Sequence, residues 1–60
     1  MPYVSIKVAG SLTVKQKEEI AAGVTKLLSD IAHKPPAVTY ITFEELDHEN
    51  WAVGGKLLSK

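Results

Sequence analysis

The sequence predicts an α+β fold: a single βαβ unit with parallel strands and a C-terminal hairpin, completed by oligomerisation. Three observations predict it. Residues 2–8 alternate between apolar and polar side chains, as a half-buried strand does. An amphipathic stretch of about five helical turns follows, and then a β-branched and aromatic run over 37–46. A strand, a helix and a strand in this order predict parallel strands joined by a right-handed crossover.

The first strand is expected to bury one face and expose the other. Val4, Ile6 and Val8 point to one side of the sheet, whereas Tyr3 and Ser5 point to the opposite side. The apolar side is the one that a helix would cover.

The helix is expected to begin after Thr13, which is a typical N-cap, with Gln16 three residues later completing a capping box. It is expected to end near His33, because Pro35 and Pro36 cannot continue it. Five apolar residues at helical spacing form one stripe that should face the sheet: Ile20, Val24, Leu27, Leu28 and Ile31.

The second strand, 37–46, has the same two-sided character. Ile41 and Phe43 share the helix side, and Tyr40 and Thr42 share the other. No further segment of this chain is available to cover that other side. A second copy of the chain is the cover that we expect.

A short hairpin is predicted after the second strand. The polar connection 47–50 leads into Trp51, and Gly54-Gly55 is typical of a tight turn. Residues 56–58 would be the returning strand. A two-stranded hairpin of this size is not stable alone, so we expect it to contact a neighbouring subunit.

The composition excludes several classes of function. Sixty residues allow one small domain, predicted to span 1–60. The net charge is zero and no basic run occurs, so nucleic acid is not an expected partner. The absence of cysteine, of a membrane-length apolar run and of a signal segment predicts a cytoplasmic protein without a membrane partner. Because so short a chain buries little surface, we expect a homo-oligomer.

Three features together resemble a known family over essentially the whole chain. They are Pro2 at the start of a strand, Gln16-Lys17 at the start of the helix, and the segment 50–57 with its aromatic, small, aliphatic and Gly-Gly residues. With these features the chain resembles the short subunits of the tautomerase superfamily, typified by 4-oxalocrotonate tautomerase. The resemblance implies a tautomerase/MIF-like fold and a hexamer built as a trimer of dimers. Active sites would lie at subunit boundaries.

The resemblance also implies a mechanism. Removal of Met1 would leave Pro2 with a free amine, which acts as general base in moving a proton next to a carbonyl. No metal and no organic cofactor would take part. Trp51 would help to make the site apolar, which favours the neutral amine.

The residues that would bind the substrate differ from the family pattern. Family enzymes hold a dicarboxylate with two arginines, but this chain contains no arginine. The first of these positions falls at Leu12, beside Ser11, and the second falls at Tyr40. Tyr40 can donate a hydrogen bond to an enolate or carbonyl oxygen. A monoacid or a neutral enol, such as a 2-hydroxydienoate or phenylenolpyruvate, is therefore the expected small-molecule enol/keto acid substrate.

Two alternatives remain open. In the first, Pro2 is protonated and the protein is a hydratase or decarboxylase, with Tyr40 or Glu45 positioning water. In the second, the chain is a catalytically inactive oligomeric binding protein, and the missing arginines favour this interpretation.

Other polar residues have ordinary explanations. Lys7, Lys34 and Lys56 are the candidates for a replacement cation, although a solvated or salt-bridged lysine is more common. His33 and His48 lack the spacing of a metal site, so no metal ligand is predicted. The adjacent residues Glu44 and Glu45 should point to opposite faces of the strand, as part of a solvated strand end.

Overall fold

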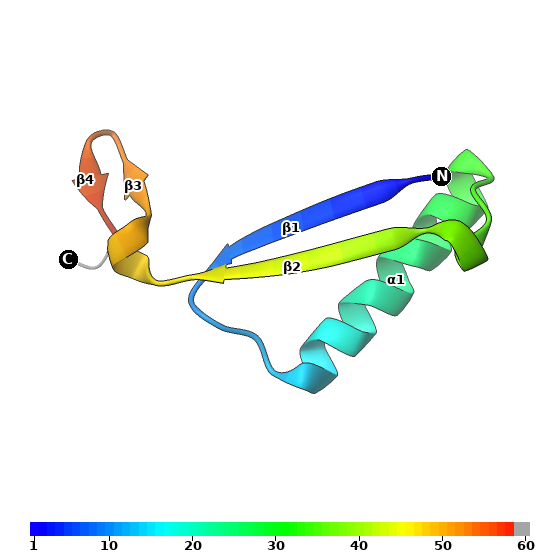
Figure 1. Cartoon of the computed structure of the whole chain (residues 1–60), viewed down its shortest axis with the longest axis horizontal. Coiled ribbons are helices and arrows are strands. Elements are labelled where there is room, and N and C mark those ends of the chain that lie inside the picture. The colour runs from blue at the N-terminus through cyan, green and yellow to red at the C-terminus, as the bar shows by residue number, and fades with distance from the viewer. Residues whose placement is uncertain (59–60) are drawn as a thin grey trace.

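The computed structural model describes residues 1–58, and its elements follow the predicted order (Figure 1). The predicted domain reaches residue 60, and residues 59 and 60 lie outside the described part. The elements are β1 (Tyr3–Ala9), α1 (Val14–Ala32), η1 (Pro36–Val38), β2 (Tyr40–Leu46), η2 (His48–Asn50), β3 (Ala52–Val53) and β4 (Lys56–Leu57), where η1 and η2 are 3-10 turns.

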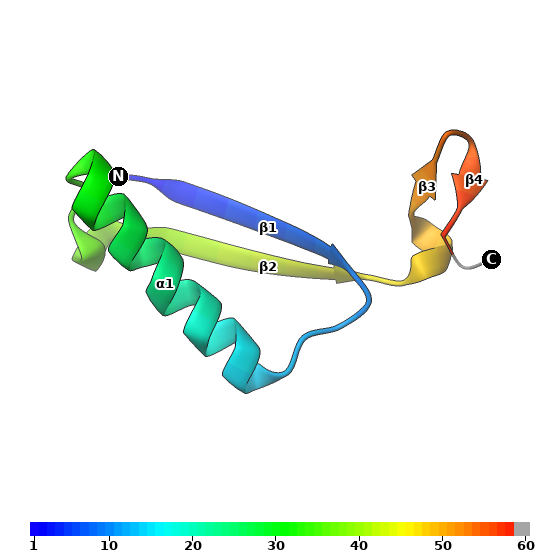
Figure 2. The same ribbon diagram turned by 180° about the vertical axis from the view of Figure 1, so that it is seen from behind.

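The two long strands are parallel, as predicted. Tyr3 lies opposite Tyr40 at one end of the ladder, and Ala9 lies opposite Leu46 at the other. Helix α1 runs along one face of this pair, and none of residues 1–58 forms a helix over the other face (Figure 2). Strand, helix and strand therefore form the predicted βαβ unit.

The predicted start of the second strand is wrong. The strand begins at Tyr40 and not at Ala37, because 36–38 form a 3-10 turn. The hydroxyl of Thr39 donates a hydrogen bond to the carbonyl of Pro35 at 2.9 Å and closes this turn. The second proline of the pair supplies a fixed φ at the start of the turn. The β-branched residues before Tyr40 consequently leave the ladder.

Both helix ends match the prediction. The side chain of Thr13 accepts a hydrogen bond from the amide of Gln16 at 3.1 Å, and the Gln16 side chain accepts one from the Thr13 amide at 2.9 Å. This reciprocal pair is a capping box. At the other end, His33 is left-handed with φ 57° and its amide donates to the carbonyl of Leu28. The prolines that follow prevent further helix.

The predicted apolar stripe of α1 is only partly packed on the sheet. Ile20, Val24 and Leu28 are half-buried. Leu27 and Ile31 were expected to face the sheet, but they remain 57% and 71% exposed. Two strands about 4.8 Å apart form a surface narrower than a helix about 10–12 Å across. The edge of the stripe therefore extends beyond the sheet.

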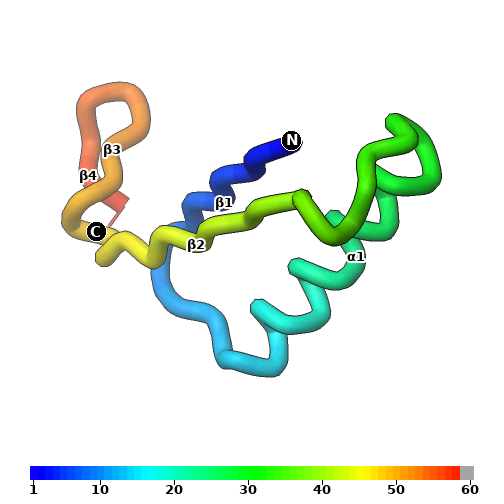
Figure 3. Tube along the Cα trace, turned by 45° about the vertical axis from the view of Figure 1, so that its right-hand side comes forward, coloured from blue at the N-terminus to red at the C-terminus, as the bar shows by residue number. Residues whose placement is uncertain are grey.

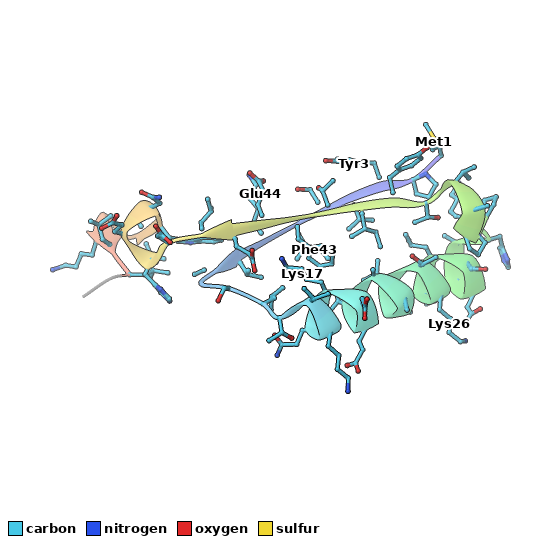
Figure 4. The ribbon with its side chains drawn as sticks, turned by 60° about the horizontal axis from the view of Figure 1, so that its bottom comes forward. Met1, Tyr3, Lys17, Lys26, Phe43 and Glu44 are labelled. Carbon is cyan, nitrogen blue, oxygen red and sulfur yellow. The ribbon has the colours of Figure 1, made fainter. Side chains whose placement is uncertain are left out.

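No side chain in the described part of the chain is fully buried. The radius of gyration is 14.3 Å, whereas about 10 Å is typical of a compact domain of this length. Large apolar side chains on both sides of the sheet are exposed, including Tyr3 and Tyr40 on the face without a helix. Figure 4 shows Tyr3 and Glu44 pointing away from α1, and Phe43 and Lys17 pointing between sheet and helix.

The C-terminal hairpin is the predicted one. Gly54 and Gly55 have φ of 60° and 83°, which is the backbone of a type I′ turn. The hairpin stands at the end of the sheet remote from the N-terminus (Figure 3). Within residues 1–58, α1 is too polar to qualify as a membrane-crossing helix.

Candidate active site

Pro2 and Tyr40 lie at the start of neighbouring strands. The amide of Tyr40 donates a hydrogen bond to the carbonyl of Pro2 at 3.0 Å. Pro2 is half-buried, and its nitrogen is joined to Met1, which is 86% exposed. Removal of Met1 would leave a secondary amine at this end of the sheet, held by the backbone bond to β2.

Hydroxyl groups line the open face next to Pro2. Tyr3 and Tyr40 are register partners, with exposed fractions of 65% and 55%. The hydroxyl of Tyr3 is hydrogen-bonded to Oγ1 of Thr42 at 3.0 Å. The Tyr3 hydroxyl is thus engaged within the sheet, whereas the Tyr40 side chain on the same face has no such bond among the described residues and is more than half exposed.

Ser11 and Leu12 lie at the opposite end of the sheet, in the β1–α1 loop (residues 10–13). The amide of Leu12 donates a hydrogen bond to Oε2 of Glu45 at 2.7 Å. Oε1 of Glu45 lies 3.2 Å from Nζ of Lys17. The Leu12 hydrogen bond, followed by Lys17, holds the pKa of the Glu45 carboxyl below its ordinary value.

Sequence reasoning missed this role of Glu45, which it assigned to a solvated strand end. The prediction that Glu44 and Glu45 point to opposite faces is confirmed. Glu44 lies 3.8 Å from Lys7 on the open face, whereas Glu45 reaches the helix side. A signal was available for the Lys17 pair but not for the Leu12 bond: the capping box places Lys17 in the first turn of α1, beside the end of β2.

Trp51 is half-buried where η2 meets the hairpin. Its amide donates to the carbonyl of His48 at 3.2 Å, and its carbonyl accepts from the amide of Leu58 at 2.9 Å. These bonds hold the main chain of Trp51 at the base of the β3–β4 hairpin, which lies at the far end of the sheet from Pro2 (Figure 3).

One chain therefore holds the predicted site residues in two groups. Pro2 and Tyr40 form the first group, and Ser11, Leu12 and Trp51 lie at the other end of β1. Seven residues of strand separate the groups by about 23 Å at about 3.3 Å per residue. A small substrate cannot contact both groups of one chain. A site that contains all five residues requires more than one copy.

The remaining polar candidates do not form a second catalytic group. Lys7 is paired with Glu44, and Lys34 and Lys56 are exposed. Within residues 1–58, no cluster of three or more metal-ligating side chains occurs. A groove of about 470 Å³ lies between α1 and the Pro36 turn, but its charged residues, Lys26 and Asp30, pair with each other at 2.7 Å.

Comparisons with known proteins agree with this fold. A family model described as "Tautomerase enzyme" matches residues 2–60. The probable tautomerase K2 of Dickeya dadantii (strain 3937) is 38% identical over 61 residues, which cover 100% of this chain and 91% of the relative.

Two solved structures are similar throughout. YwhB, a homologue of 4-oxalocrotonate tautomerase, is 29% identical with a TM-score of 0.91, covering 98% of this chain and 97% of that one. A heterohexameric 4-oxalocrotonate tautomerase from Chloroflexus aurantiacus J-10-fl is 22% identical with a TM-score of 0.90, covering 100% and 97%. At that identity the second likeness shows the fold alone.

Proposed function

Because this chain belongs to the tautomerase family, we propose that it is a cofactor-independent tautomerase with Pro2 as general base. It interconverts the enol and keto forms of a small acid. The observation that carries the proposal is the position of Pro2 at the head of β1, backbone-bonded to Tyr40. That bond holds the ring of Pro2 while its nitrogen, once Met1 is removed, has a free electron pair.

The proton moves within the substrate, so the reaction is an isomerisation. The Pro2 nitrogen takes the proton of the enol hydroxyl, and the O–H electrons form the carbonyl as the double bond shifts. The ammonium then returns the proton to the carbon that has become nucleophilic. The hydroxyl of Tyr40 donates a hydrogen bond to the substrate oxygen and stabilises its developing charge.

The substrate is a monoacid or neutral enol, such as a 2-hydroxydienoate or phenylenolpyruvate. Seven lysines and no arginine make up the basic residues, and a lysine does not offer the planar fork that binds a carboxylate through two bonds. Leu12 and Tyr40 present an aliphatic group and one hydroxyl where the family pattern has arginines. A doubly charged substrate would therefore lack its two anchors.

The active assembly is a homo-oligomer, which we propose to be a hexamer arranged as a trimer of dimers. Its support is the absence of a fully buried side chain in residues 1–58, together with the exposed face of the sheet that carries Tyr3 and Tyr40. In such an assembly Ser11, Leu12 and Trp51 of neighbouring copies approach Pro2. The domain range 1–60 and the cytoplasmic location remain predictions.

Replacement of Pro2 by alanine tests the proposal. After removal of Met1, Pro2→Ala is expected to lower kcat for a 2-hydroxydienoate by about 10²–10⁴-fold, the usual contribution of a general base. Size-exclusion chromatography should show the same oligomer, because the hydrogen bond of Pro2 to Tyr40 uses main-chain atoms that alanine keeps. An assembled, processed Pro2→Ala protein with unchanged kcat contradicts the proposal.

The pH–rate profile separates this function from the hydratase or decarboxylase alternative. A base must be unprotonated, so kcat/KM should rise with pH through its pKa, whereas an acid gives a falling limb. Glu45 is already bound to Leu12 and Lys17 at the far end of the sheet from Pro2, so it is not available to position water at Pro2 of its own chain. A processed oligomer without activity on any enol would support the binding-protein alternative.

A further inference from the structure

We propose that Glu45 is a positioning residue that holds the β1–α1 loop, and with it Ser11 and Leu12, in the shape that binds substrate. The inference rests on the proposed function, because it assigns substrate contact to this loop. Glu45 itself would not touch the substrate. Its side chain would act through the amide of Leu12.

The loop is anchored on both sides of Ser11. The amide of Gly10 donates to the carbonyl of Leu46 at 2.8 Å, which extends the β1–β2 ladder by one bond. The amide of Leu12 donates to Oε2 of Glu45 at 2.7 Å. A bond of this length to a carboxylate is a strong, charge-assisted hydrogen bond. Because Gly10 and Leu12 are both hydrogen-bonded to β2, the main chain of Ser11 between them has little freedom to move.

The carboxylate of Glu45 is itself oriented. Its other oxygen, Oε1, lies 3.2 Å from Nζ of Lys17, and the side chain is 31% exposed. Each oxygen therefore has a different partner, one from the loop and one from α1. The neighbouring carboxylate does not compete for these partners, because Glu44 lies on the opposite face of the sheet, where its Oε1 is 3.8 Å from Nζ of Lys7. The His48 ring lies against Gly10, where Cε1 would be 3.4 Å from an added Cβ.

Loss of this anchor has a specific kinetic consequence. Ser11 and Leu12 would hold the part of the substrate that does not exchange the proton. Their contacts are the same in the ground state and in the transition state, so loosening them raises KM and leaves kcat nearly unchanged. A purely structural defect would instead lower the fraction of active enzyme, which reduces the apparent kcat at constant KM.

The experiment compares three variants of the processed, full-length oligomer. Glu45→Ala removes the acceptor for the Leu12 amide, and Glu45→Gln keeps an acceptor oxygen without the charge. Asp30→Ala is the matched control, since it removes a carboxylate paired with a lysine at 2.7 Å on α1. We expect Glu45→Ala to raise KM about tenfold, as the loss of one charge-assisted bond would. In Glu45→Gln, KM should return most of the way to the value of the unmodified protein. Asp30→Ala should leave KM unchanged.

A second readout follows the loop without any substrate. Amide hydrogen exchange at Leu12 should be faster in Glu45→Ala than in the unmodified protein or in Asp30→Ala. Should Glu45→Ala fail to assemble, Glu45→Asp makes the same test, because its shorter side chain withdraws the carboxylate from the Leu12 amide.

The possible failures can be told apart. An inactive processed protein with Pro2 free overturns the proposed function. An active protein whose KM and Leu12 exchange do not respond to Glu45→Ala overturns this inference alone. If Glu45→Gln raises KM as much as Glu45→Ala does, the inference is also overturned, because the charge of Glu45 and not its acceptor oxygen would then determine KM.

Discussion

The amide of Tyr40 and the carbonyl of Pro2 are joined by a hydrogen bond of 3.0 Å, which precedes the parallel ladder that begins at Tyr3. The bond uses only main-chain atoms, so it does not depend on the identity of either side chain. It places a tyrosine hydroxyl and the N-terminal ring at the same end of two neighbouring strands. The proton transfer that we propose depends on this juxtaposition.

Replacement of Tyr40 by phenylalanine tests the role of its hydroxyl. The main-chain bond to Pro2 is kept, so only the donor to the substrate oxygen is lost. We expect kcat/KM to fall by about ten- to a hundredfold, the range between one ordinary hydrogen bond and a full oxyanion donor. Tyr3→Phe is the matched control, because its hydroxyl is bonded to Thr42, and it should leave kcat/KM unchanged. Equal effects of the two substitutions would contradict the assignment.

The stability of the protein should depend on its concentration. No described side chain is fully buried in a single chain, and Leu27 and Ile31 of α1 are largely exposed. Association is then required to bury apolar surface, so Tm should rise as the protein is concentrated. Thermal unfolding at several concentrations, with sedimentation velocity at each, measures this. A folded monomer with a constant Tm would show that the chain is stable without partners.

Two glycines should respond in opposite directions to alanine. Gly10 has φ +97° and its added Cβ would meet His48 at 3.4 Å, so Gly10→Ala should destabilise the protein by about 1–2 kcal/mol. Gly23 lies inside α1, where a Cβ would have no neighbour within 4 Å. Gly23→Ala should therefore stabilise it by about 0.5–1 kcal/mol. Urea unfolding measures the free energy of unfolding of both variants. If Gly23→Ala is less stable than the unmodified protein, another subunit packs against this part of α1.

Glu45 should contribute stability that is lost in acid. Its folded-state pKa is lowered from 4.5, first by the Leu12 hydrogen bond and then by Lys17. A group with a depressed pKa stabilises the fold above its unfolded pKa, and this contribution disappears as pH falls through the folded value. The difference in Tm between the unmodified protein and Glu45→Gln should therefore be largest near neutral pH and shrink below about pH 4.5. A difference that is constant with pH would contradict it.

The control for this measurement is Lys17→Met. It removes the ion pair but leaves the Leu12 hydrogen bond, which is the largest single cause of the lowered pKa. Part of the pH dependence should therefore remain in Lys17→Met. If the pH dependence of the difference in Tm disappeared completely in Lys17→Met, the lowered pKa of Glu45 would be due to Lys17.

The sequence was sufficient for the elements whose cause is local. The capping box at Thr13, the stop before Pro35 and the Gly54-Gly55 turn each depend on residues close in the chain, and all are confirmed. The start of β2 was misplaced, because Val38 and Thr39 favour a strand but the double proline closes a 3-10 turn around them.

Features that depend on contacts between elements could not be predicted in the same way. The exposure of Leu27 and Ile31 follows from the width of the sheet, which periodicity does not report. The Glu45–Leu12 bond joins residues 33 positions apart, and no local pattern indicates it. The division of the site residues between two ends of β1 likewise appears only when the strand is placed in space.

The state of the Pro2 nitrogen is the central claim, and one comparison tests it most directly. The same protein is prepared with Met1 retained and with Met1 removed, as verified by intact mass, and both forms are assayed with a 2-hydroxydienoate at equal oligomer concentration. We expect the form with the free amine to be active and the form with Met1 to lose at least about a hundredfold in kcat, since an amide nitrogen cannot accept the proton. Equal activity of the two forms would contradict the mechanism.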